Sequence, residues 1–141
     1  QPSEPGLFSR PPSDTSESLT VEELAAATGL SVLDIGELER FGLIEHRPLG
    51  PTRVYDEEAL LVARAAARFR AHGVEPRHLR MYKVAADREA GVFEQVVLPI
   101  VRQRDADSRR RAIEVLDELA RLGEGLHAAM LRRALRDITG P

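Results

Sequence analysis

The chain has 141 residues, a formal net charge of −3 and 43% hydrophobic residues, among them four Phe, two Tyr and no Trp. It contains no cysteine, which excludes disulfides, thiolate metal sites and cysteine nucleophiles. No apolar run approaches the roughly 18–20 residues that span a bilayer, and no signal-peptide pattern is present, so we expect a cytoplasmic, mainly α-helical protein.

The charged residues are unevenly distributed along the chain. Residues 20–60 contain nine acidic and three basic residues, a net charge of −6. Residues 61–83 contain six basic residues and one acidic residue, a net charge of +5. The front of the chain is therefore acidic and the middle basic, and this distribution matters more for the choice of partner than the total charge does.

Residues 1–18 are rich in Pro and Ser and poor in apolar side chains. Such a composition buries too little apolar surface to offset the entropy of ordering the chain. We therefore expect a flexible linker at 1–18. Because the chain starts at Gln1 rather than at Met, we also expect it to be the downstream part of a longer protein.

Two capping boxes predict two short helices in succession. Thr20 is followed three residues later by Glu23, and Ser31 is followed in the same way by Asp34. Gly29 lies between the two helices, and the second is expected to end near residue 41. Two short helices joined by a tight turn indicate a helix-turn-helix.

A hairpin and a third helix are predicted next. Residues 43–55 form two short apolar stretches around a Pro/Gly-rich tip, which is typical of a wing. Asp56 is placed to cap a helix that His72 and Gly73 end. Residues 19–73 are therefore expected to form a winged helix-turn-helix.

Residues 74–141 are predicted to form helices with a regulatory or association role. Pro76 is suited to the first position of a helix, whereas Pro99 should kink or end one. From Asp105 onward the apolar repeat is helical, but Gly123 and Gly125 weaken it. The pattern leaves open either two helices or one bent helix.

Residues 19–79 resemble the MerR family of transcriptional regulators. The resemblance rests on motifs in the helix-turn-helix, the wing and the end of the third helix, namely Thr28-Gly29-Leu30-Ser31, Gly42-Leu43-Ile44, Arg53-Val54-Tyr55 and His72-Gly73-Val74. It implies a winged-helix fold. It also implies a homodimer of the full protein, built through the helices that follow the winged domain.

The DNA-contacting pattern of that family is missing here. The family has an Arg-Tyr-Tyr run in its recognition helix, where this chain has Gly36, Glu37 and Leu38. The predicted helix sums to a charge of −2, and DNA presents one phosphate charge per roughly 1.7 Å of duplex. We therefore expect a degenerate winged helix that is not the main DNA reader.

Residues 72–97 are similar to the C-terminal half of the FtsR subfamily of actinobacterial cell-division regulators. In that subfamily a DNA-binding domain lies at the N-terminus and a second MerR-like unit follows a linker. The resemblance implies that this chain is the effector or dimerisation half of such a regulator.

Two alternatives remain open. In the first, the winged helix binds DNA directly through Arg40, Arg47, Arg53 and Arg64. In the second, the chain is a small-molecule sensor. The expected effector or partner site would lie between the helices, lined by Phe69, Met81, Tyr82 and Phe93, with Arg77, His78 and Arg80 at its rim.

No pattern of catalytic residues is evident. The four His show no metal-ligand spacing, and the chain has no phosphate-binding Gly-rich loop, nucleophile elbow or HExxH motif. We expect no enzymatic activity, no metal and no cofactor.

Overall fold

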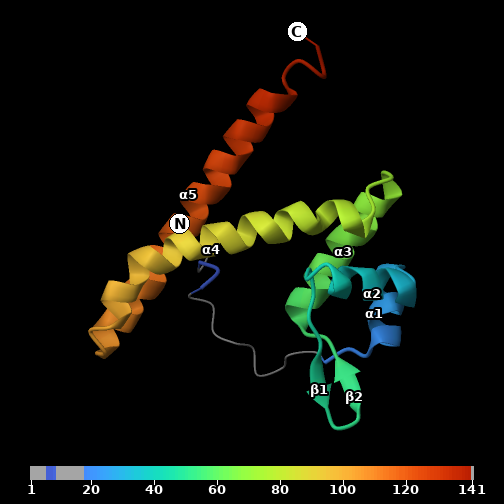
Figure 1. Cartoon of the computed structure of the whole chain (residues 1–141), viewed down its shortest axis with the longest axis horizontal. Helices are drawn as coiled ribbons and strands as arrows, with labels where there is room; N and C mark the ends of the chain where they lie inside the picture. Colours follow the sequence, from blue (N-terminus) through green and yellow to red (C-terminus); the bar gives the residue numbers. More distant parts are fainter. Residues whose placement is uncertain (1–5, 9–17, 141) are drawn as a thin grey trace, which may run out of the picture. The chain divides into compact units, whose positions relative to one another are not determined.

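The computed structural model describes residues 6–8 and 18–140, so most of the linker expected at 1–18 lies outside the described residues (Figure 1). The chain forms two compact units. We call the described residues 18–88 the winged-helix unit, and residues 6–8 together with 89–140 the helical unit. Each is described by itself.

The helix-turn-helix begins as its capping boxes predict. Helix α1 (Val21–Thr28) is capped by Thr20, whose hydroxyl accepts from the Glu23 amide at 3.2 Å, and helix α2 (Val32–Arg40) is capped by Ser31, whose hydroxyl accepts from the Asp34 amide at 3.0 Å. Gly29 ends α1 with φ of 80°, in the left-handed region that glycine adopts without strain.

The predicted wing is a two-stranded antiparallel hairpin. Strand β1 (Arg47–Leu49) pairs with β2 (Thr52–Val54) in a register that places Arg47 opposite Val54. Leu19 forms an isolated antiparallel bridge with Tyr55, with N–H···O distances of 2.9 and 2.7 Å, and so joins the start of the unit to the wing.

Helix α3 (Glu57–Ala71) is capped by Asp56, and the 3₁₀ helix η1 (Pro76–Leu79) follows it. Figure 1 shows α1, α2 and α3 gathered beside the wing. Their core is made of apolar side chains with at most 7% of their surface exposed, including Leu24, Ile35, Leu38, Ala63 and Leu79. A Leu- and Ala-rich core permits the close helix packing that the composition predicted.

Helix α4 (Arg80–Val101) contains Pro99 and ends two residues after it, in agreement with the prediction that Pro99 kinks or ends its helix. Helix α5 (Ala106–Leu135) is one continuous helix through Gly123 and Gly125, so the two-helix alternative is wrong. Side chains from α4 fill the space beside Gly123, where an added Cβ would meet Glu89 and would lie 3.7 Å from the Phe93 ring.

The mainly α fold, a winged helix followed by a helical extension, is confirmed. None of the helices in residues 6–8 and 18–140 is long and apolar enough to cross a membrane.

Candidate interaction surfaces

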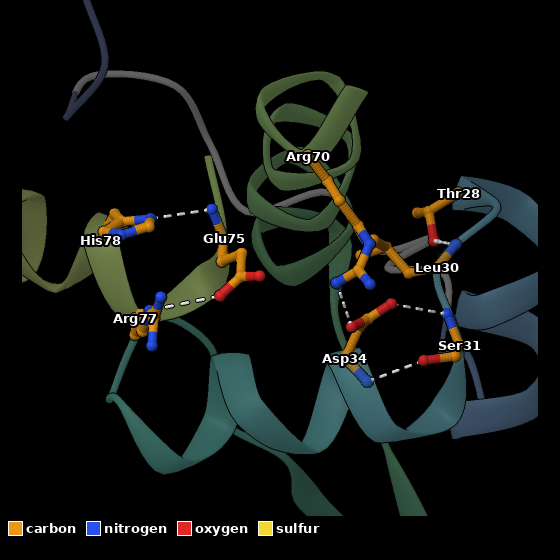
Figure 2. Close-up of polar contacts among 8 residues, drawn as sticks. All are labelled: Thr28, Leu30, Ser31, Asp34, Arg70, Glu75, Arg77 and His78. Atoms are coloured by element: carbon orange, nitrogen blue, oxygen red, sulfur yellow. Dashed lines mark hydrogen bonds and ion pairs between the residues drawn. The ribbon is translucent and has the colours of Figure 1, made fainter. Parts of the chain in front are cut away.

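The acidic side chains of α2 are held by residues from elsewhere in the winged-helix unit. Arg70, near the end of α3, reaches Asp34 at an N···O distance of 2.5 Å, while Asp34 also accepts from the Ser31 amide at 3.2 Å (Figure 2). The Asp34 side chain is only 13% exposed. This carboxylate therefore ties α2 to α3 and is not offered to a partner.

Glu39 ties α2 to the wing in the same way. Its Oε1 accepts from the His46 backbone amide at 3.2 Å, lies against the His46 ring nitrogen, and accepts a long bond from the Tyr55 hydroxyl at 3.4 Å. The charge of −2 summed along α2 therefore overstates the negative charge that α2 presents at its surface. Arg70 neutralises Asp34, and the wing surrounds Glu39.

The contact with Glu39 also affects Tyr55. Burial raises the pKa of Tyr55 above the ordinary 10.0, and the negative charge of Glu39 raises it further. The ring itself is buried at 3% exposure, edge-on to His46. Folding therefore favours the neutral phenol.

The stability of the winged-helix unit is expected to fall as pH rises through about 10, because the unfolded chain then loses the Tyr55 proton before the folded one does. Below that pH both states are protonated and the contribution is constant. Thermal unfolding midpoints measured from pH 8 to 11 check this. Tyr55→Phe should flatten the alkaline fall, whereas the control Tyr82→Phe should keep it; an equal fall in both variants would contradict the assignment.

The surface that α2 leaves exposed is apolar and small. Val32 is 52% exposed and Leu33 76% exposed, and a Cβ added at Gly36 would meet nothing within 4 Å. Arg40, the one basic residue of α2, pairs with Glu37 at 3.8 Å and lies over the Phe41 ring, 5.7 Å from its centroid. A helix that reads DNA needs several donors on this surface, and among the described side chains of α2 Arg40, 74% exposed, is the single basic one.

The other arginines of the DNA-binding alternative lie apart from α2. Arg47 donates to Ser18 at the base of the wing. Arg53 on β2 and Arg64 on α3 are exposed. Two exposed arginines can contact phosphates but cannot by themselves read a base sequence.

The structure brings together part of the predicted effector site. The rings of Phe69 and Tyr82 contact each other at 5.9 Å between centroids. Met81 and Arg80 are exposed, and the other two rim residues are engaged with Glu75: Arg77 pairs with its carboxylate at 3.2 Å, and His78 Nδ1 accepts from its amide at 3.0 Å (Figure 2). Phe93 belongs to the helical unit. The effector site stays a prediction.

A cavity of about 280 Å³ lies elsewhere in the winged-helix unit, between the loop after α2 and the start of α3. It is lined by Gly42, Leu43, Ile44, Glu45, Asp56, Glu58, Ala59, Val62 and Lys83. Its volume is at the lower end of those that hold small ligands, and three carboxylates against one lysine disfavour an anion. None of the predicted effector residues lines it.

In the helical unit, the second half of α5 exposes large apolar side chains. Leu126 is 62% exposed and Met130 58% exposed, and Leu122, Leu131 and Leu135 are also exposed. The four-residue spacing of Leu122, Leu126 and Met130 indicates one helix face. The association role that the sequence predicts for residues 74–141 covers this part of α5.

Within residues 6–8 and 18–140, no three His, Cys, Asp or Glu side chains gather in a way that could hold a metal ion.

The profile of a protein family described as "Rv1828-like, C-terminal domain" matches residues 17–139. Two relatives, named uncharacterized HTH-type transcriptional regulators Rv1828 of Mycobacterium tuberculosis and Mb1859 of Mycobacterium bovis, are each 37% identical over 89 residues. The matched stretch is 63% of this chain and 36% of each relative.

Proposed function

Since the chain belongs to the Rv1828-like C-terminal domain family, we propose that it is the regulatory and association part of an HTH-type transcriptional regulator. In this proposal the winged helix is a scaffold and not the main DNA reader. DNA is bound by the full-length regulator, and this chain supplies dimerisation and response to an effector.

The observation that carries this proposal is the exposed surface of α2. Its outward positions include Val32, Leu33 and Gly36, and its single arginine, Arg40, lies 3.8 Å from Glu37 with 74% of its side chain exposed. Base edges and phosphates are recognised by charged and hydrogen-bonding side chains. Arg40 is the single exposed base that α2 offers, and the two aliphatic residues and the glycine beside it offer no donor.

We also propose, from the sequence motifs, that the regulator belongs to the MerR family and to the FtsR subfamily within it. The relatives are named as regulators and not as enzymes, which supports the expectation that this chain has no catalytic activity.

Titration of the chain with a fluorescent duplex of mixed sequence tests the proposal. We expect weak binding at about 200 mM salt, with Kd no tighter than the 10⁻⁴–10⁻⁶ M of non-specific contacts. The reason is that α2 presents a single exposed arginine, Arg40, to DNA, so the salt dependence should also be shallow. Fluorescence anisotropy at about 50 and 200 mM salt measures both quantities.

Two variants separate this reading from direct DNA recognition. Arg53→Ala and Arg64→Ala remove the two arginines of that alternative that form no ion pair or hydrogen bond within the described residues. Neither substitution should alter the selectivity between duplex sequences, because no selectivity is expected. Tight, sequence-selective binding that falls steeply with salt and is weakened by both substitutions would overturn the proposal.

We further propose that α5 pairs with the α5 of a second copy in antiparallel orientation. Residues 114–124 contain three exposed acidic residues, Glu114, Glu118 and Glu124, and one Arg, whereas residues 125–136 contain three Arg and no acidic residue. Antiparallel pairing places each acidic segment opposite a basic one, and it covers the exposed Leu122, Leu126 and Met130.

A further inference from the structure

A short segment far from α5 in sequence lies against it in the helical unit. The Phe8 backbone amide donates to Asp117 Oδ1 at 2.7 Å, across a separation of 109 residues. Asp117 lies in the middle of α5 and is 6% exposed. A carboxylate buried to this extent requires donors, because an unsatisfied buried charge is strongly unfavourable.

The donor that Asp117 receives is backbone and not a basic side chain. Among the described residues, no Lys, Arg or His forms an ion pair with Asp117, although Arg121 follows it by one helical turn. The contact therefore requires only a backbone N–H at position 8, which every residue except proline has. A charge-assisted bond of this kind is stronger than one between neutral groups.

Gly6 provides the close approach that brings the segment onto the helix. A Cβ added at Gly6 would overlap the Asp117 carboxylate, so only glycine fits there without displacement of the acid. The neighbouring side chains face solvent in large part, with Leu7 68% and Phe8 43% exposed. The site therefore contacts the backbone of a turn, with glycine two residues before the donor amide.

We propose that Asp117 is the centre of a peptide-binding site on α5, and that residues 6–8 are a strap held in it. The strap precedes the winged-helix unit in the chain, and the rest of the helical unit follows that unit from Glu89, within α4. The winged-helix unit therefore has a segment of the helical unit on either side of it in the sequence. This inference is independent of the proposed dimer and of DNA binding.

Amide hydrogen exchange of Phe8, measured by NMR on the whole chain, tests the strap. In the unaltered protein the Phe8 amide should exchange at least about tenfold more slowly than in a free peptide of residues 1–11, because exchange requires the bond to Asp117 to open. Asp117→Ala should abolish this protection. Asp117→Asn, which keeps an acceptor but no charge, should retain part of it.

If Asp117→Ala disturbs the folding of α5, Gly6→Ala provides a second test, because residue 6 lies outside every described helix. It should also remove the protection of Phe8, because the added Cβ forces the segment away from the carboxylate. Leu7→Ala and Glu118→Ala, at exposed neighbouring positions, are the matched controls and should preserve it. The strap is rejected if Phe8 exchanges at the free-peptide rate in the unaltered chain, or if Gly6→Ala leaves its protection intact.

Discussion

Leu38→Ala is expected to lower the free energy of unfolding of the winged-helix unit by about 2–5 kcal/mol, the usual cost of truncating a buried leucine. Leu38 lies on α2, has no exposed surface, and packs in a core with Leu24 and Ile35. Removing its branched end leaves a void that three short helices and a hairpin can fill only in part. Since small domains are stable by about 5–15 kcal/mol in total, the loss is a large fraction of the whole.

Urea unfolding followed by tyrosine fluorescence measures this effect. Both tyrosines of the chain, Tyr55 and Tyr82, lie in the winged-helix unit, so the signal reports that unit alone. Leu33→Ala is the matched control, because it makes the same substitution in the same helix at a side chain that is 76% exposed. We expect it to change stability by less than about 0.5 kcal/mol. Equal losses at the two positions would mean that the buried face of α2 has been assigned wrongly.

The elements that the sequence predicts well are those set by neighbouring residues. Thr20 with Glu23 and Ser31 with Asp34 are capping pairs three residues apart, and both helix starts lie where these pairs place them. Pro99 acts on its own helix, which ends two residues later. Gly123 differs, because the cost of this helical glycine is offset by the approach of Glu89 and Phe93, which the local pattern does not contain. No such contact explains the continuation of the helix through Gly125.

The contacts that decide what α2 can bind are long-range, and residue patterns do not reveal them. Asp34 meets Arg70 across 36 residues, and Glu39 meets Tyr55 across 16. A sum of charges along the helix treats both carboxylates as exposed, whereas in the fold they join α2 to α3 and to the wing. The expectation of a helix unsuited to DNA is retained for a different reason: α2 exposes Val32 and Leu33 and has a single exposed arginine, Arg40.

The same limit applies to the predicted effector site. Periodicity placed Phe69 and Tyr82 on faces that could meet, and their rings do make contact. It could not indicate that Arg77 and His78 would both be engaged by Glu75, or that Phe93 would belong to the other unit. Predicting a cavity requires knowledge of how several helices pack around a space, and the apolar repeat of a single helix does not contain that information.

Leu126→Glu is expected to convert an α5-paired dimer to monomer. Burying one leucine side chain contributes about 1.5–3 kcal/mol, and a two-fold interface contains it twice, so the substitution should raise the dimer dissociation constant by about a hundred- to ten-thousandfold. The buried glutamate charges add to this loss. Sedimentation velocity over a range of protein concentrations measures the change.

Leu61→Glu is the matched control, because Leu61 on α3 and Leu126 on α5 are both 62% exposed but lie in different units. If exposure alone drove association, the two substitutions would have equal effects. Pairing along α5 requires that only Leu126→Glu dissociates the dimer.

The charge pattern supplies an independent check. Arg133→Glu should weaken an antiparallel pair, because it removes attraction to the acidic segment 114–124 of the other copy. Adding Glu124→Arg to the same chain should restore part of the affinity. A monomer for the unaltered chain at all concentrations would exclude this interface.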